Sequence, residues 1–276
     1  MFPFFVLTKT IVETSNHKQN FMDKFFSKTL KTSPLGLNIF LLSCISGYPM
    51  GAKIICVYYE QNRITNQQAK HMMSFCSISG PMFMIGTVGV GIFCSFKAGV
   101  VILISNIIAA LINGLIHKDK SNETVDYFNN FYNKKEFSIS DIVFDSLTSI
   151  LMVGGFVILS FLLIDTLIST NILPFISNTI SCVFNNSISA NVVQSFLCGI
   201  IEITRGAIDL SSTNLNIQAL TVLSSGLIGF GGFSILFQSL AFLNKLNIKF
   251  KEVLFQKTTQ GILSTIIAFL LVIITF

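Results

Sequence analysis

Three charged side chains lie inside strongly apolar stretches of the sequence, where ionisable groups are costly and often functional. Glu202 and Arg205 fall in the stretch 188–210, and Lys53 falls in the stretch 34–58. A guanidinium group can bind a carboxylate through two parallel hydrogen bonds, so Arg205 is a candidate ligand for an organic anion. Two other interpretations remain open: Arg205 pairs with Glu202 three residues earlier, or its side chain extends to the membrane interface. Glu202 is also a candidate to bind a coupling cation or a proton.

Lys53 ends the segment SGYPMGAK (46–53) and can neutralise an anion, or it can extend from the end of this segment toward water. Tyr48, in the same segment, is a candidate to stack on an aromatic substrate. Ser and Thr in membrane helices also bond to their own backbone or to a neighbouring helix, which is the structural alternative for the hydroxyl groups. The uncharged side chains that can offer hydrogen bonds to a substrate are Ser46, Ser79, Thr204, Ser234 and Gln238.

The sequence contains none of the common patterns of a catalytic or cofactor-binding site. HExxH, GxGxxG, the P-loop and GxSxG are absent, and none of the six cysteines forms a CxxC pair. No combination of a nucleophile with a base is indicated either. We therefore expect no enzyme activity, no cofactor and no metal. The coupling ion, Na⁺ or H⁺, is left open.

The composition is that of a membrane protein. Of 276 residues, 51% are hydrophobic and 11% are charged, and the mean hydropathy is +0.71. An average soluble domain has about 25% charged residues, and so few charges cannot cover a soluble surface. The net charge of +5 comes almost entirely from lysines between apolar blocks, a pattern typical of membrane topology and not of a nucleic-acid surface. We predict an all-α polytopic membrane protein that contacts the lipid bilayer and binds no nucleic acid.

Several of the apolar blocks are interrupted by glycine or proline. Irregular backbone at membrane depth is tolerated only where it is buried in protein or lines a cavity, so these interruptions predict a polar site near the midplane. The apolar blocks are 2–13, 34–58, 71–94, 98–117, 139–168, 188–210, 217–243 and 258–276. The first is too short to span, since a helix needs about 20 residues. The residues expected to break helices or expose backbone groups are Gly47, Pro49, Gly51, Gly80, Pro81, Gly206, Gly231 and Gly232.

The interruptions recur in the same order in two halves of the chain. Gly51-Ala52 corresponds to Gly206-Ala207, and each pair is followed by a second glycine-rich break. We therefore predict a first repeat over 1–117 and a second over 139–276, joined by a polar cytoplasmic linker over 118–138.

The distribution of lysine and arginine predicts how these repeats are oriented. If 34–58 and 188–210 are re-entrant hairpins, four loops fall on one face of the membrane and hold fourteen of the 18 bases. This face should be cytoplasmic, and the two hairpins then enter from opposite sides. If both stretches spanned fully, basic loops would lie on both faces. The four basic loops are 14–33, 59–70, 118–138 and 244–257, and the opposite face has 95–97, 169–187 and 211–216.

Inverted repeats with broken helices are typical of transporters, whose substrate lies where the broken elements meet. The segment FMDKFFSKTLKT (21–32) alternates apolar residues with lysine, which predicts a helix along the membrane interface. A soluble linker helix is the alternative for this segment.

Four segments carry a resemblance to a known family: SGYPMGAK (46–53), FCSISGPMFMIGTVGVG (75–91), EITRGA (202–207) and GFGGFSILFQ (229–238). In this order they resemble the sporulation integral membrane proteins of the YlbJ type. These belong to the wider nucleoside-recognition gate group, whose architecture is similar to that of concentrative nucleoside transporters. The resemblance covers nearly the whole chain and implies that the two repeats are gate repeats.

The resemblance implies a role in endospore formation, in the outer forespore membrane of a spore-forming, low-GC bacterium. It also implies movement of dipicolinic acid, a small organic anion, by alternating access. Two alternatives are kept: a nucleoside transporter of the same fold, which needs no cationic side chain, and a spore-assembly membrane scaffold that transports nothing. Assembly of the chain into an oligomer is left open.

Overall fold

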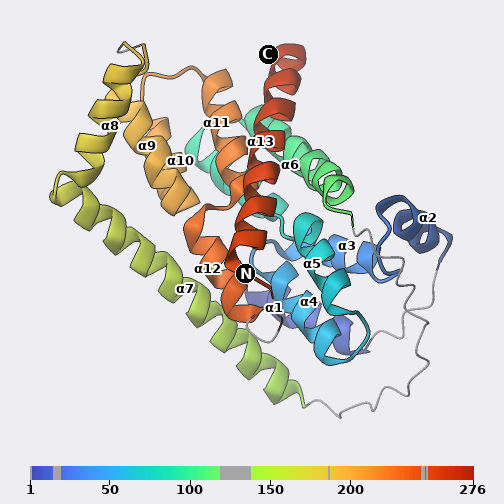
Figure 1. Cartoon of the computed structure of the whole chain (residues 1–276). Coiled ribbons are helices and arrows are strands. Elements are labelled where there is room, and N and C mark those ends of the chain that lie inside the picture. The colour runs from blue at the N-terminus through green and yellow to red at the C-terminus, as the bar shows by residue number, and fades with distance from the viewer. Residues whose placement is uncertain (1, 15–19, 119–137, 186, 244–245, 247) are drawn as a thin grey trace. The chain divides into compact units, whose positions relative to one another are not determined.

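The computed structural model describes residues 2–14, 20–118, 138–185, 187–243, 246 and 248–276. Most of the predicted linker, 119–137, lies outside the described residues. The regular elements within them are all helices, shown in chain order in Figure 1. They are α1 (Phe2–Thr14), α2 (Phe21–Leu30), α3 (Gly36–Ser46), α4 (Met50–Glu60), α5 (Asn66–Cys76), the π-helix η1 (Met82–Ile92), α6 (Phe96–Ile116), α7 (Ile139–Ser169), α8 (Ile172–Val183), α9 (Ala190–Ile201), α10 (Ile203–Ser211), α11 (Ile217–Phe230), α12 (Gly232–Phe242) and α13 (Phe250–Thr275).

Four helical stretches are long and apolar enough to cross a membrane. They are Phe96–Ile116, Ile139–Ser169, Ile217–Phe242 and Phe250–Thr275. A helix rises 1.5 Å per residue, so each of them exceeds the roughly 30 Å of the hydrocarbon core. The predicted fold class, an all-α polytopic membrane protein, is confirmed.

The chain forms two compact units, and each unit takes segments from both halves of the sequence. Unit 1 comprises Met1–Gly80, Ala110–Val153 and Gln238–Gln256. Unit 2 comprises Pro81–Ala109, Gly154–Phe237 and Lys257–Phe276. The two predicted repeats are defined by sequence similarity, and their inverted orientation in the membrane stays a prediction.

The core of unit 1 is built around an aromatic cluster. The ring of Phe26, on α2, lies 5.9 Å from that of Phe40 on α3 and 6.0 Å from that of Phe75 on α5. Helix α2 thus forms within the segment predicted to be helical and packs through Phe26. Phe21 and Phe25 on the same helix are exposed, as an interfacial helix requires.

Unit 2 contains three short helices, α8, α9 and α10, that lie side by side (Figure 1). Helix α8 was not predicted, because its segment was assigned to the loop 169–187. Leu173, Ser177 and Ser181 are its buried residues, and their spacing of four places them on one helical face. Two of these three buried residues are serines, so the buried face of α8 lacks the apolar pattern that predicts an amphipathic helix.

A buried polar network connects α6, α11 and α13 within unit 2. The side-chain amide of Asn106 donates to Ser225 Oγ at 3.2 Å and accepts from Ser264 Oγ at 3.2 Å. The hydroxyl groups of Ser105 and Ser225 are 2.7 Å apart. All four side chains are buried, so these hydrogen bonds satisfy polar groups that would otherwise be costly within the unit.

Candidate functional site

Two broken elements of the first half of the chain meet in unit 1. Helix α3 ends at Ser46, Tyr48-Pro49 has a cis peptide bond, and α4 begins at Met50. Gly47 has φ of +74°, and a Cβ at this position would lie 2.7 Å from the backbone nitrogen of Gly80. Only glycine combines this left-handed conformation with so close an approach. Gly80 ends the non-helical stretch 77–80 between α5 and η1, so the two breaks lie against each other.

Three predicted hydrogen-bonding or stacking residues are buried at this junction: Ser46, Tyr48 and Ser79. The Ser46 hydroxyl donates to the carbonyl of Leu42, in its own helix. For Ser46 the structure therefore favours the structural interpretation of its hydroxyl. Pro81 is the N-cap of η1, and with Gly80 it marks the second break.

A second pair of breaks meets in unit 2. Glu202 is extended, with φ of −142° and ψ of 120°, and separates α9 from α10. Gly231 and Gly232 have φ of +87° and +70° and separate α11 from α12. A Cβ on Gly232 would lie 3.1 Å from the carbonyl oxygen of Ile201, so this break also lies against its neighbour.

Two of the predicted break residues, Gly51 and Gly206, instead lie inside helices α4 and α10. Their role is close packing. A Cβ on Gly51 would lie 2.1 Å from the carbonyl oxygen of Cys76, and one on Gly206 would lie 2.1 Å from the Cα of Gly199. The Gly-Ala pairs that correspond in the two halves of the sequence therefore mark positions of close packing in α4 and α10.

The alternative in which Glu202 forms an ion pair with Arg205 is not what the structure shows. Glu202 is the N-cap of α10, and its Oε2 accepts a hydrogen bond of 2.8 Å from the backbone N–H of Arg205. This carboxylate is buried and lies at the positive end of the helix dipole. The capping role uses the backbone of Arg205 and leaves its guanidinium to other partners.

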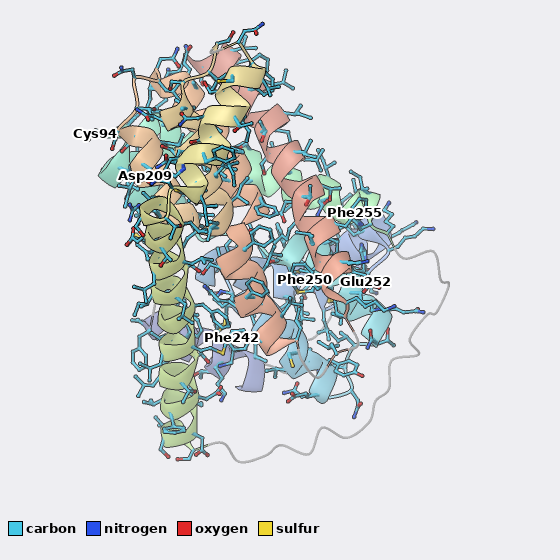
Figure 2. All side chains as sticks on the ribbon, turned by 60° about the vertical axis from the view of Figure 1, so that its left-hand side comes forward. Cys94, Asp209, Phe242, Phe250, Glu252 and Phe255 are labelled. Atoms are coloured by element: carbon cyan, nitrogen blue, oxygen red, sulfur yellow. The ribbon has the colours of Figure 1, made fainter. Side chains whose placement is uncertain are left out.

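The Arg205 guanidinium binds two aspartates in unit 2. Its Nε lies 3.1 Å from both carboxylate oxygens of Asp209, one turn later on α10 and labelled in Figure 2. Its Nη1 lies 3.2 Å from Asp165 Oδ1 on α7, and the Arg205 side chain is 27% exposed. Both aspartates are partners of Arg205. One positive charge thus faces two negative charges.

Lys53 belongs to a second charged cluster, in unit 1. Its Nζ lies 2.8 Å from Asp145 Oδ2 and 2.6 Å from Ser149 Oγ, both on α7. The Nζ of Lys9, on α1, lies 2.6 Å from the same Asp145 oxygen. Two ammonium groups therefore converge on one carboxylate oxygen.

The surroundings of this cluster are apolar. Lys53 Nζ lies 6.0 Å from the centre of the Phe5 ring and 5.9 Å from that of Phe242. The side chains of Lys9 and Lys53 are 15% and 11% exposed, whereas that of Asp145 is 42% exposed.

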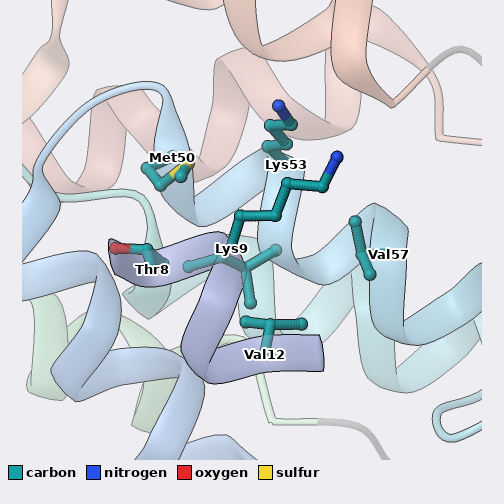
Figure 3. Close-up of a pocket in the computed structure, with 7 residues that line it drawn as sticks. Thr8, Lys9, Val12, Met50, Lys53 and Val57 are labelled. Carbon is teal, nitrogen blue, oxygen red and sulfur yellow. The ribbon is translucent and has the colours of Figure 1, made fainter. Parts of the chain in front are cut away.

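Beside the cluster is a half-open pocket of about 250 Å³, including space open to the outside. Figure 3 shows both lysine side chains extending to the same side of this pocket, away from Val12. The pocket is lined by Thr8, Lys9, Val12, Met50, Lys53, Ile54 and Val57. The charged residues of this mostly apolar lining are therefore Lys9 of α1 and Lys53 of α4.

Sequence reasoning missed Lys9, Asp145 and Ser149 as members of a site. Each of them lies in an apolar block, and Asp145 and Ser149 are four residues apart on one face of α7. The sequence pattern that could have identified Asp145 and Ser149 is a charged residue four positions before a hydroxyl residue in an apolar block. The lysines that complete the cluster come from distant segments and could not be assigned to it by spacing.

Lys257 was predicted to lie in the basic loop 244–257, and this is wrong. Helix α13 begins at Phe250, so Lys257 is helical, and it is buried at 2% exposure. Its Nζ donates to Gln260 Oε1 at 2.9 Å. Lys257 is close in sequence to other lysines near the start of α13, so its burial could not be inferred from the sequence.

Three candidates remain, and each lies in a different part of the structure. Ser234 is buried in unit 2, with its hydroxyl 3.4 Å from the carbonyl oxygen of Phe156. Gln238 is buried and belongs to unit 1. Thr204 is half-buried in the first turn of α10. Among the described residues, no group of three or more His, Cys, Asp or Glu side chains is arranged to hold a metal ion.

Comparison with known proteins gives one informative relative. No family profile matches the chain. No solved structure matches it either. The chain is 24% identical to the sporulation integral membrane protein YlbJ of Bacillus subtilis, an alignment that covers 98% of this chain and 72% of that protein. The chain is an integral, multi-pass membrane protein, and the resemblance to sporulation proteins of the YlbJ type that its four motifs carry is confirmed over almost its entire length.

Proposed function

We propose that this protein is a sporulation membrane transporter that moves a small organic anion, dipicolinate, across the outer forespore membrane by alternating access. The observation that carries the proposal is the cluster of Lys9, Lys53 and Asp145 next to the α3–α4 break. Two ammonium groups, one buried and one half-buried, converge there on one carboxylate oxygen beside an open pocket. Paired cationic side chains of this kind can bind an anionic ligand.

Lys53 is a stronger candidate than Arg205 for the residue that binds the anion. The guanidinium of Arg205 already faces Asp209 and Asp165, so the local charge is negative and repels an anion. Among the contacts of the described residues, Lys53 shares the Asp145 carboxylate with Lys9, so two cations meet at one carboxylate. The ammonium group, a compact charge on a flexible stem, can follow a ligand carboxylate as it enters.

The junctions between breaks supply the moving parts of the proposed mechanism. At each junction, backbone near a helix end meets backbone of a second break, in the manner of the discontinuous helices that form transporter sites. A hairpin can move there without breaking the hydrogen bonds of a continuous helix. Alternate opening of the two hairpins would then expose the site to one side of the membrane at a time.

The test is uptake of labelled dipicolinate by liposomes that contain the full chain. Lys53→Met should reduce uptake at least tenfold, because it removes one of the two cations and keeps the length of the side chain. Lys97→Met is the matched control: Lys97 also lies in an apolar helix, and its Nζ is 4.4 Å from the centre of the Phe276 ring within unit 2. This variant should transport normally.

Two results would contradict the proposal. Uptake of a nucleoside such as uridine, with no loss in Lys53→Met, would favour the nucleoside transporter. Liposomes that accumulate neither solute above protein-free controls would favour the assembly scaffold.

A further inference from the structure

We propose that helix α2 binds the headgroups of anionic phospholipids through its exposed face, and that it thereby attaches unit 1 to a negatively charged leaflet of the membrane. The sequence pattern predicts only that this segment lies along the membrane interface. The structure adds which side chains of α2 face outward and which charge they carry. The inference goes beyond the proposed function, because it applies equally to a transporter and to a scaffold.

The exposed face of α2 carries large apolar side chains. Phe21, Met22 and Phe25 are 82%, 64% and 63% exposed. Phe21 and Phe25 are four residues apart and so lie on the same side of the helix. A helix of 10 residues is about 15 Å long and cannot cross the hydrocarbon core of roughly 30 Å. Exposed aromatic side chains on so short a helix fit the boundary between headgroups and acyl chains.

Lysines accompany these apolar side chains. Lys24 and Lys28 on α2, and Lys31 at its C-cap, are all exposed. No carboxylate in the described part of the chain lies within ion-pair distance of these three ammonium groups. The acidic residue of α2, Asp23, is buried at 3% exposure, and its carboxylate accepts a hydrogen bond of 2.8 Å from the backbone N–H of Asn20. The exposed charges of α2 and its C-cap are therefore all positive.

The other side of α2 is fixed to the rest of unit 1. The Phe26 ring lies 5.9 Å from that of Phe40 on α3 and 6.0 Å from that of Phe75 on α5. Leu30, one turn after Phe26, is buried at 2% exposure. This packing determines the rotation of α2 about its axis, so the apolar and the basic side chains are presented outward together.

The combination of exposed aromatic and basic side chains indicates which surface α2 binds. Apolar side chains favour insertion into any bilayer, whereas lysines distinguish an anionic leaflet from a zwitterionic one. Each lysine near an anionic leaflet contributes about a fivefold gain in affinity. Lysine side chains are long enough to place the ammonium group among the phosphates while an aromatic ring lies deeper. The partner that fits is therefore a phospholipid whose headgroup has a net negative charge.

The test uses the composition of the chain, which contains no tryptophan. Phe25→Trp in the full chain places a single indole on the proposed lipid-binding face. The protein is reconstituted in vesicles of phosphatidylcholine and phosphatidylglycerol, one of which carries brominated acyl chains that quench a nearby indole. Brominated phosphatidylglycerol should quench about two- to fivefold more strongly than brominated phosphatidylcholine at the same mole fraction. This preference should weaken as the salt concentration rises from about 0.05 M to about 0.5 M.

Two pairs of substitutions of equal charge, each combined with Phe25→Trp, test the role of the lysines. Lys24→Gln with Lys28→Gln should remove most of the preference for phosphatidylglycerol, while the aromatic side chains still bring the indole to the bilayer. Lys249→Gln with Lys251→Gln is the matched control, because it removes two exposed lysines near the start of α13. The control should retain the preference.

Three results would overturn the proposal. Equal quenching by the two brominated lipids would show that α2 does not select anionic headgroups. Quenching by neither lipid would place α2 away from the bilayer, as a soluble linker helix or at a contact with another protein. A preference that persists without Lys24 and Lys28 would assign it to other basic residues. If the Phe25→Trp protein does not fold, Phe21→Trp, one turn earlier on the same face, serves as the reporter.

Discussion

Single charged residues in this protein take their roles from the partners around them. Lys53 shares a carboxylate with a second lysine, whereas Arg205 faces two aspartates. Both are charges inside apolar sequence, and sequence alone ranks Arg205 higher because of its planar, forked group. We propose the reverse ranking, because the guanidinium of Arg205 is already occupied by two aspartates, whereas two ammonium groups meet at Asp145.

Glu202 is expected to act chiefly as the N-cap of α10. Glu202→Ala leaves the buried N–H of Arg205 without its acceptor and should destabilise the protein by about 1 kcal/mol, the usual cost of losing a cap. Glu202→Gln keeps an acceptor oxygen and should lose less. Thermal unfolding in detergent measures both effects. Equal stability of the alanine variant and the unchanged protein would show that the cap contributes nothing.

At the scale of elements, the sequence predicts the broken helices well and their exact ends poorly. Proline and glycine at 47–49, 80–81 and 231–232 mark real breaks, because these residues cannot continue a regular helix or favour leaving it. The break at Glu202 has no such residue and was misplaced to Gly206. This break consists of one extended residue, Glu202, between α9 and α10, and these two helices pack against each other.

The close contact of α9 with α10 should make Gly206 sensitive to substitution. A Cβ at Gly206 would lie 2.1 Å from the Cα of Gly199, and backbone cannot move aside as a flexible side chain does. Gly206→Ala should therefore cost about 1–3 kcal/mol, the range for an overpacked core. Gly154→Ala is the control, since a Cβ there meets nothing within 4 Å. Thermal unfolding that is equally affected in both variants would contradict this role of Gly206.

At the scale of the whole molecule, the two compact units differ from the two predicted repeats. Helices α6, α7, α12 and α13 each contribute residues to both units. Sequence similarity relates one half of the chain to the other, whereas packing combines segments of both halves. The predicted inverted orientation of the two hairpins therefore needs a test of topology.

Labelling of single cysteines from each side of the membrane provides that test. In a chain whose six cysteines are replaced, Ser138→Cys lies beside the basic linker and should react with an impermeant maleimide from the cytoplasm. Ser212→Cys follows α10 and should react from the opposite side. Reaction of both positions from one side would contradict hairpins inserted from opposite faces.

The sequence by itself determined the class of this protein and most of its broken helices. So few charges cannot cover a soluble surface, and glycine and proline favour breaks in a helix, so both conclusions depend on local composition. The tertiary structure decided which charges meet. Lys9 and Lys53 are separated from Asp145 by 136 and 92 residues, and Lys257 turns inward from a basic segment. Spacing along a helix relates only residues three or four positions apart, whereas an ion pair between distant segments exists only once the helices that carry them have packed.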